Sequence, residues 1–341
     1  MNNDKMDIII DKKTFYGWPA FSIVRTLDSC ADAFSMTAIL NSENSDIESA
    51  MTPFRYQDCF VNIDNDRILS GTLEQFTASI SESEKSINIQ GRSFTGILID
   101  CSIYNIGYQF DGLKISEIAK TLCSPFGISV IVNDDSAVIA EARATPGQTV
   151  YEFLNQLASD NGLLLSNDAR GNLVIGKYEK GKSVDTIIEG ESRLISASGT
   201  YDSTNRFSIY QVLQQQDGNN DISEIAEDEN IIKYRPKVIS GSSGNSENIE
   251  ETAKWARALG LAKNVNIEIG LSGWRTTSGK LWDPGDTVIL KSPGALIKKE
   301  SEFIISRVSL KCDVSSGKTT DLTLVLPETF SGELPRIFPW A

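Results

Sequence analysis

Short strand-like segments separated by turn clusters recur at both ends of this sequence, and they constrain the fold more than any other feature. In residues 6–106, alternating or β-branched runs such as 21–24, 34–39 and 60–63 lie between turn residues. Strand-like runs return in residues 181–330. Many short strands at such spacing are typical of small barrels or sandwiches. We therefore expect two β-barrel-like domains, one in each region.

Turn residues in the first β region predict how its strands connect. Residues 64–66 (Asp-Asn-Asp) lie between the apolar runs 60–63 and 68–73, and such side chains tolerate turn conformations. We expect a hairpin at this point. Residues 86–90 alternate strictly between polar and apolar, which predicts a strand that ends at Gly91.

Between the β regions, in residues 107–180, the apolar spacing changes from that of strands to that of helices. Residues 114–122 place their apolar side chains on one helical face. Thr149 and Glu152 form a Thr-x-x-Glu capping box that starts a second helix. We expect a small α/β domain inserted between the two β domains, so that the whole chain is α+β and mainly β.

The two helix–strand units of this inserted domain are similar to each other. Ile115 aligns with Val150, and Gly127 aligns with Gly162. The pattern indicates either an internal duplication or the common features of any helix–glycine–strand unit. After the second helix, turn residues at 168–172 predict a hairpin.

The second β region contains one helix, one polar stretch and an apolar C-terminal tail. Asn248 and Glu251 can cap the helix, and Gly260 lies near its end. Residues 214–248 are polar and acidic, and we interpret them as a mobile surface loop. The tail, residues 331–341, must pack on its own domain, on a neighbouring subunit or on another protein. Its large apolar side chains are Leu334, Ile337, Phe338 and Trp340.

The sequence contains no histidine, which removes several classes of enzyme. Ser-His-Asp and Cys-His nucleophilic sites, histidine-containing zinc sites and imidazole acid–base catalysis are excluded. Carboxylate pairs remain possible, although among 46 acidic residues some pair always looks suggestive. The five cysteines are scattered without a Cys-x-x-Cys pair, which favours reduced thiols of a chain made in a cytoplasm.

The net charge of −14 limits the partners. Nucleic acids and anionic membrane surfaces attract basic patches, so we expect no stable nucleic-acid binding. No apolar stretch approaches the roughly 18 residues that span a bilayer. The apolar run near the N-terminus is too short for a signal peptide. We therefore expect a soluble protein without membrane insertion.

Three groups of residues have a functional interpretation that competes with a structural one. Residues 91–96 suggest a phosphate loop but lack its Gly-Lys-Ser/Thr ending, so we expect a structural turn. Four aspartates without the spacing of a calcium loop are interpreted as turn residues. The acidic run 227–229 has no base beside it in sequence and predicts a solvated loop. The four aspartates are Asp64, Asp66, Asp134 and Asp135.

Five arginines and three tryptophans lie beside predicted strands or turns. Arginine forms bidentate pairs with carboxylates at subunit interfaces, so these arginines either serve an interface or are simply solvated. The tryptophans flank Gly or Pro turns and predict core positions rather than ligand-stacking ones. A Pro-Gly turn at 284–285 leads into a strand at 287–290. The residues are Arg92, Arg193, Arg206, Arg235, Arg275, Trp18, Trp274 and Trp282.

A series of turn and core segments extends over nearly the whole chain, at 18–28, 89–96, 98–102, 125–128, 149–154, 168–173, 234–236 and 279–284. In order and spacing these segments resemble the Mu-like baseplate hub proteins of contractile phages. The resemblance implies a homotrimeric ring with pseudo-sixfold barrel packing, placed between the tail tube and the central spike. Apart from residues 234–236, the polar stretch 214–248 does not match the family.

We therefore predict a structural baseplate hub of a contractile phage tail, a ring adaptor between tail tube and spike, and not an enzyme. We expect no catalytic, cofactor-binding or metal-binding residues and no cofactor. The expected partners are further copies of the chain in a homotrimer, the central spike protein, tail tube or distal tube proteins, and baseplate wedge proteins. The alternative is a tail-associated cell-wall hydrolase or carbohydrate-binding component.

The expected domains are 6–106, 107–180, 181–330 and a C-terminal tail, 331–341. The expected location is the tail baseplate of the virion, after assembly in the cytoplasm of the host bacterium. The particle can be a phage, a prophage or a phage-derived injection machine. Because DNA must pass the hub without adhering, we expect part of the acidic excess to line the ring, and a net basic lumen would contradict this.

Overall fold

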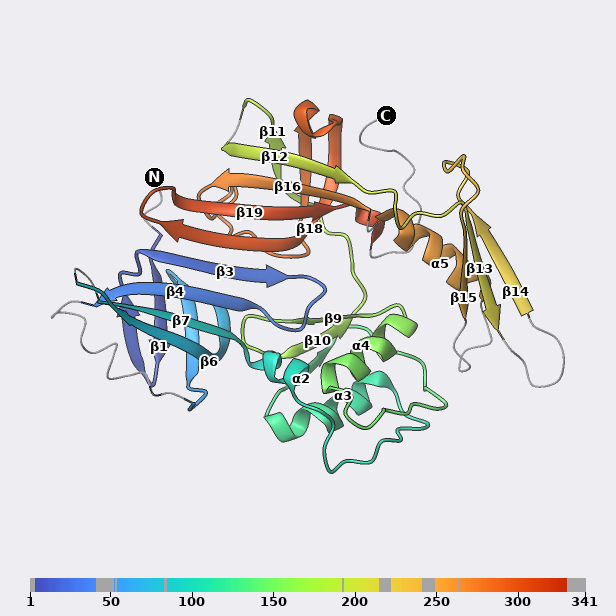
Figure 1. Cartoon of the computed structure of the whole chain (residues 1–341), viewed down its shortest axis with the longest axis horizontal. Coiled ribbons are helices and arrows are strands. Elements are labelled where there is room, and N and C mark those ends of the chain that lie inside the picture. Colours follow the sequence, from blue (N-terminus) through green and yellow to red (C-terminus); the bar gives the residue numbers. More distant parts are fainter. Residues whose placement is uncertain are drawn as a thin grey trace. The chain divides into compact units, whose positions relative to one another are not determined.

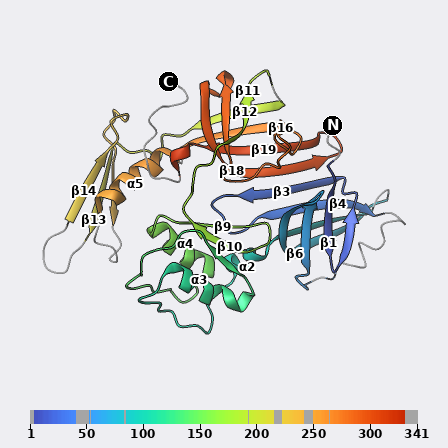
Figure 2. The same ribbon diagram turned by 180° about the vertical axis from the view of Figure 1, so that it is seen from behind.

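The computed structural model describes residues 4–40, 52, 54–82, 85–191, 193–214, 222–240, 249–262 and 264–329. The chain divides into two compact units. The first comprises Met1–Lys177 and Arg307–Asp321, and the second comprises Tyr178–Ser306 and Leu322–Ala341. Strands β18 (Ile297–Asp313) and β19 (Gly317–Val325) therefore belong partly to each unit. Figures 1 and 2 show from opposite sides that strands dominate the chain, as predicted for a mainly β α+β protein.

The larger sheet of the first unit is antiparallel. Its strands follow the order β18-β3-β4-β7-β6-β5-β1-β2, and β18 contributes its second part. The other strands are β1 (Met6–Ile10), β2 (Lys13–Tyr16), β3 (Ala20–Thr26), β4 (Ala33–Leu40), β5 (Asp58–Ile63), β6 (Asp66–Ile80) and β7 (Lys85–Ser93). Alternate side chains along these strands are buried and form the core of the sheet, among them Ile8, Ile10, Ile23, Met36, Val61, Ile63 and Ile89.

The predicted hairpin at residues 64–66 is confirmed. Ile63 of β5 pairs with Asp66 of β6, so Asp64 and Asn65 form the turn. Asp64 has a φ of 53°, a left-handed conformation that aspartate tolerates. Its carboxylate accepts a hydrogen bond from the backbone nitrogen of Lys5 at 2.9 Å, which ties the turn to the start of the chain.

The prediction that a strand ends at Gly91 is wrong, because β7 continues to Ser93. A Cβ atom at Gly91 would lie 2.2 Å from the carbonyl oxygen of Thr72 and 2.7 Å from ring atoms of Phe34. The glycine therefore allows close packing in the middle of the sheet. A 3-10 turn, η1 (Phe94–Gly96), and the short helix α2 (Ile97–Asp100) follow, so residues 91–96 form neither a phosphate loop nor a simple turn.

A small α/β domain follows in the same unit. Helices α3 (Ile115–Cys123) and α4 (Val150–Asp160) accompany a sheet with the order β8-β10-β9. Strand β8 (Val130–Val132) is parallel to β10 (Leu173–Gly176), and β9 (Leu164–Asn167) is antiparallel to it. The predicted helices and the 168–172 hairpin are thereby confirmed. The shared core includes Leu98, Ile118, Leu122, Phe153, Leu154, Leu165 and Ile175.

Local hydrogen bonds explain where the second helix begins and ends. Glu152 donates its backbone N–H to the Thr149 hydroxyl at 3.1 Å, and its carboxylate accepts from the Thr149 nitrogen at 3.0 Å. This confirms the predicted capping box. Gly162 follows the helix with a φ of 65°, and Gly127 after α3 has a φ of 68°. The internal duplication stays a hypothesis.

The second unit contains a sheet that mixes parallel and antiparallel pairs. Strand β12 (Leu194–Tyr201) is antiparallel to β16 (Val265–Ser272), and β11 (Ser183–Ile188) is parallel to β17 (Thr287–Ser292). The first part of β18 pairs with β17. Gly285, with a φ of 90°, forms the predicted turn before β17. The three tryptophans predicted to lie in the core are buried: Trp18 in the first unit, and Trp274 and Trp282 in this one.

The interpretation of residues 214–248 as a loop is wrong for much of that stretch. Strands β14 (Ile222–Glu227) and β15 (Pro236–Ser240) flank β13 (Ile209–Gln214), and α5 (Ile249–Ala262) packs on this sheet. Both added strands are short edge strands whose exposed side chains include the polar Glu224 and Lys237 as well as the apolar Ile225 and Val238, which conceals their alternation in the sequence. Residues 215–221, residues 241–248 (with the predicted cap Asn248) and the tail 331–341 lie outside the described residues.

We expect Gly91→Ala to lower the free energy of unfolding by about 2–3 kcal/mol, because the added methyl group overpacks the sheet. Gly107→Ala is the matched control, since no atom lies within 4 Å of its would-be Cβ and its stability should change by less than about 0.5 kcal/mol. Urea denaturation followed by circular dichroism measures both. Equal effects of the two substitutions would contradict the close-packing explanation.

Candidate assembly surfaces

Three buried aspartates are paired with arginines of their own unit. A general acid or base must reach its substrate, and a nucleophilic carboxylate must be free to attack it. These carboxylates are instead enclosed and hydrogen-bonded within the fold. The pairs and their N–O distances are Arg25–Asp32 at 3.1 Å, Arg193–Asp185 at 3.1 Å and Arg206–Asp228 at 2.8 Å.

The Arg206–Asp228 pair joins the start of β13 to the end of β14. Arg206 donates from Nε at 2.8 Å and from Nη2 at 3.2 Å to the two carboxylate oxygens, and the Asn230 backbone donates a third hydrogen bond at 3.1 Å. Burial acts to raise the pKa of Asp228, but the hydrogen bonds and charge of Arg206 outweigh it and hold that pKa below its ordinary value. The prediction of a solvated acidic run is therefore wrong at Asp228.

The five arginines considered for subunit interfaces all bond within their own chain. Arg92 donates to Glu74 at 2.7 Å and to Asp100 at 3.3 Å, and these hydrogen bonds raise its pKa. Arg235 donates to the carbonyl oxygens of Thr204 and Arg206. Arg193 pairs with Asp185, and Arg275 donates to the Gly279 carbonyl oxygen. Each of these arginines therefore fixes a strand end or a turn of its own chain, and a further role at a subunit interface stays a prediction.

The candidate calcium ligands serve local structure. Asp135 accepts hydrogen bonds from the backbone nitrogen and hydroxyl of Ser116 at the start of α3, at 3.2 and 2.7 Å. Burial acts to raise the pKa of Asp135, but these hydrogen bonds lower it overall. Asp134 accepts from the Lys177 nitrogen at 3.0 Å. In the described part of the chain, no group of three or more potential ligands lies close enough to hold a metal ion.

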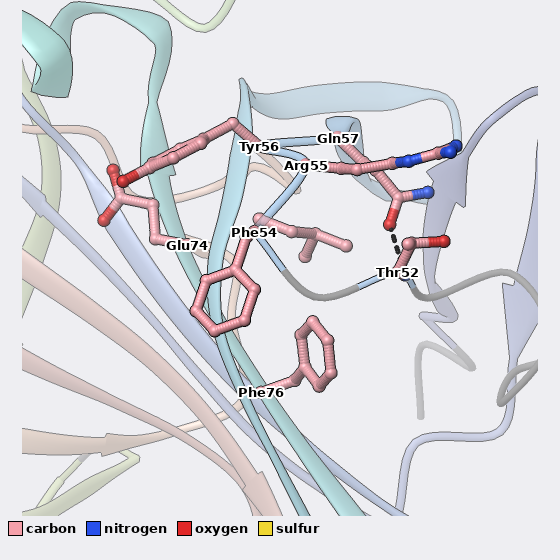
Figure 3. A pocket seen from close by; sticks show the side chains of 8 residues that line it. Thr52, Phe54, Arg55, Tyr56, Gln57, Glu74 and Phe76 are labelled. Atoms are coloured by element: carbon pink, nitrogen blue, oxygen red, sulfur yellow. Dashed lines mark hydrogen bonds between the residues drawn. The ribbon is translucent and has the colours of Figure 1, made fainter.

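A cavity in the first unit is too small for a substrate. It lies between residues 52–57 and β6, where Phe54, Gln57 and Phe76 contribute to its lining (Figure 3). Its volume is about 40 Å³, whereas sites for small molecules occupy roughly 300–1,000 Å³. The Thr52 nitrogen donates to the Gln57 side-chain oxygen at 2.8 Å across its rim. This cavity has room for water but not for a sugar or a peptide.

Exposed large apolar side chains are the surface features that the sequence did not reveal. Phe54 is 97% exposed and Ile232 is 100% exposed. Aromatic and aliphatic side chains of this kind anchor protein interfaces. The alternation of apolar residues in the sequence predicted the strands. Which face of each strand meets solvent depends on how the strands pair, and that is seen only in the structure. Further examples are Tyr16, Tyr56, Tyr104, Val314, Ile225, Tyr234 and Val238.

Three family models match successive segments of the chain. Residues 5–93 match the N-terminal domain of the Mu phage baseplate assembly protein GpP-like family. Residues 95–177 match the second domain of the gp44-like baseplate hub protein family. Residues 245–333 match the fourth domain of the Mu phage baseplate assembly protein GpP. The matches occur in domain order and together cover most of the chain.

Individual proteins give the same result over the full length. The baseplate hub protein gp44 of Escherichia phage Mu is 25% identical over 337 residues, covering 94% of this chain and 87% of the relative. The 43 kDa tail protein of prophage MuSo2 from Shewanella oneidensis is 28% identical with a TM-score of 0.84, covering 97% of this chain and 100% of that one. A tail protein from Neisseria meningitidis MC58 shares the fold at 21% identity, with a TM-score of 0.84 and coverage of 97% and 99%.

An α/β domain inserted into a mainly β chain, together with these matches, defines a structural protein of phage tails. Within that class, the chain belongs to the Mu-like baseplate hub proteins. The family predicted from the order of turn and core segments is thereby confirmed.

We expect Arg206→Met to destabilise the β13–β15 sheet by about 3 kcal/mol, because it leaves the Asp228 carboxylate buried without its cation. Lys254→Met is the matched control, since it removes an exposed pair with Glu250 and should cost less than about 0.5 kcal/mol. Amide hydrogen exchange of β13 and β14 measures both. Unchanged exchange in Arg206→Met would show that the pair does not hold the sheet.

Proposed function

We propose that this chain forms a ring that connects the tail tube to the central spike at the distal end of a contractile phage tail. The observation that carries the proposal is the match of three successive hub-family models in domain order. The phage Mu relative bears the name of a baseplate hub protein. The proposed location is accordingly the tail baseplate of the virion, with assembly in the cytoplasm of the host bacterium.

The chemistry of the described residues supports a mechanical role rather than an enzymatic one. The buried carboxylates are paired with arginines, and the cavity beside β6 is far smaller than a substrate. Large exposed apolar side chains such as Phe54 and Tyr104 offer contacts to other proteins instead. Binding energy would then come from broad interfaces with the spike, the tube or distal tube proteins and the baseplate wedges.

A homotrimer is the oligomer that we propose for this ring between the tail tube and the spike. Each chain contains two β units, so three chains would supply six β units around an axis and could bridge sixfold and threefold neighbours. Closed cyclic symmetry is the usual outcome for a homo-oligomer. We also propose the division 6–106, 107–180, 181–330 and 331–341 as the domains of each subunit.

The charge supports a ring that neither binds nucleic acid nor enters a membrane. A net charge of −14 opposes phosphate binding, and we propose that part of it faces the lumen. None of the helices in the described ranges combines the length and apolarity that a membrane crossing requires.

We expect the purified protein to form a trimer of about three times 37.4 kDa in solution. Multi-angle light scattering over a concentration series measures this mass, and mixing with the cognate spike protein extends the test. A chain that stays monomeric at high concentration both alone and with the spike would contradict the trimeric ring.

The alternative function, a cell-wall hydrolase or carbohydrate-binding tail component, predicts a different result. We expect no lytic band when the protein is run in a zymogram that contains intact peptidoglycan, because the sequence has no histidine and the buried Asp32, Asp185 and Asp228 are paired with arginines. A known muramidase on the same gel is the control. A lytic band that a single Asp or Glu substitution abolishes would overturn the structural assignment.

A further inference from the structure

The sheet formed by β13, β14 and β15 has one covered face and one open face. Tyr210, Val212 and Ala226 are buried on the face that packs under α5, and Val212 and Ala226 form a core there with Ala253. Because side chains alternate along a strand, the residues between them point to the opposite face. In the strand pairing, Gln211 of the central strand β13 lies beside Ile225 of β14 and Val238 of β15, so all three side chains are on this opposite face. We call this surface the outer sheet face.

The outer sheet face is more apolar than a solvated face should be. Ile225 is 54% exposed, Val238 is 57% exposed and Leu213 is 37% exposed. A sheet with one face in water normally presents polar side chains there. Apolar side chains on all three strands therefore indicate that something covers this face.

The size of the outer sheet face fits a short peptide better than a folded protein. Three strands about 4.8 Å apart and five residues long, at about 3.3 Å per residue, cover about 240 Å². A stable protein–protein interface needs roughly 800 Å² from each partner. A single extended segment with a few large apolar side chains matches the smaller area.

The end of this chain is such a segment, and it starts close by. The last described element, η4 (Pro327–Thr329), lies against α5, the helix that covers the other face of the same sheet. Residues 331–341 contain the large apolar side chains of Leu334, Ile337, Phe338 and Trp340. Eleven residues reach at most about 36–40 Å. That length is sufficient to pass around a helix about 10 Å in diameter and the sheet beneath it.

We propose that the C-terminal tail, residues 331–341, docks on the outer sheet face of its own chain. Its apolar side chains cover Leu213, Ile225 and Val238 there. The small sheet then lies between α5 on one side and the tail on the other, so the tail holds two edge strands in place.

A mutant cycle tests this docking. The variants are Ile225→Ser with Val238→Ser, a truncation after Phe330, and the two changes combined. We expect each single change to lower the melting temperature by a few degrees and to speed amide exchange in β13–β15 at least tenfold. The combined variant should lower the melting temperature and speed amide exchange no more than the stronger single change does, because both changes remove the same contact.

Val314→Ser is the matched control, since Val314 is 87% exposed at the β18–β19 turn of the other unit. It should leave exchange in β13–β15 unchanged with or without the tail. Additive effects of the face variant and the truncation, or a truncation that leaves exchange in β13–β15 unaltered, would overturn the proposal.

If the Ile225→Ser, Val238→Ser variant fails to fold, a photo-crosslinking amino acid in place of Phe338 provides a second test. The expected product joins position 338 to residues 209–240 within one chain, mapped by mass spectrometry. A product that joins two chains would assign the face to a neighbouring subunit's tail, and a product elsewhere in the chain would exclude the face; either result contradicts the proposal. Neither exchange nor crosslinking within a chain requires the trimer, so failure here leaves the ring proposal untouched.

Discussion

The pairing of β3 with the second part of β18 is the interaction on which the first unit depends. Residues 21–26 pair in antiparallel register with 307–312, which lie near the other end of the chain. Ile23, Val308 and Leu310 are buried along this pairing. Without it β3 would be an edge strand with unpaired backbone groups, which is a template for aggregation. The first sheet is therefore complete only after nearly the whole chain has been made, and such long-range contacts slow folding.

Short-range features were largely predictable from the sequence. The capping box at Thr149, the turn at residues 64–66 and the hairpin after α4 depend on neighbours a few residues apart, so their signals are local. Burial of the tryptophans followed from their positions beside turns. The family was predictable as well, because its segments keep their order along the chain.

The predictions that were wrong concern positions whose structure is determined by contacts between residues far apart in the sequence. Gly91 looked like the end of a strand, yet it is required by Phe34 and Thr72. Asp228 looked solvated because Arg206, 22 positions earlier, gives no local signal of the pairing. Strands β14 and β15 were hidden because their exposed side chains are partly acidic and each is short. Tertiary contacts, rather than propensity, determine all of these positions.

The same contacts support a mechanical role. The arginines that looked suited to interfaces hold turns and strand ends of their own chain, and exposed apolar side chains are further candidate anchors to other proteins. Cryo-electron microscopy of intact tails tests this account most directly. The account predicts that the chain occupies a threefold ring between the tail tube and the spike. Density for the chain elsewhere in the particle, or as single copies without a ring, would contradict it.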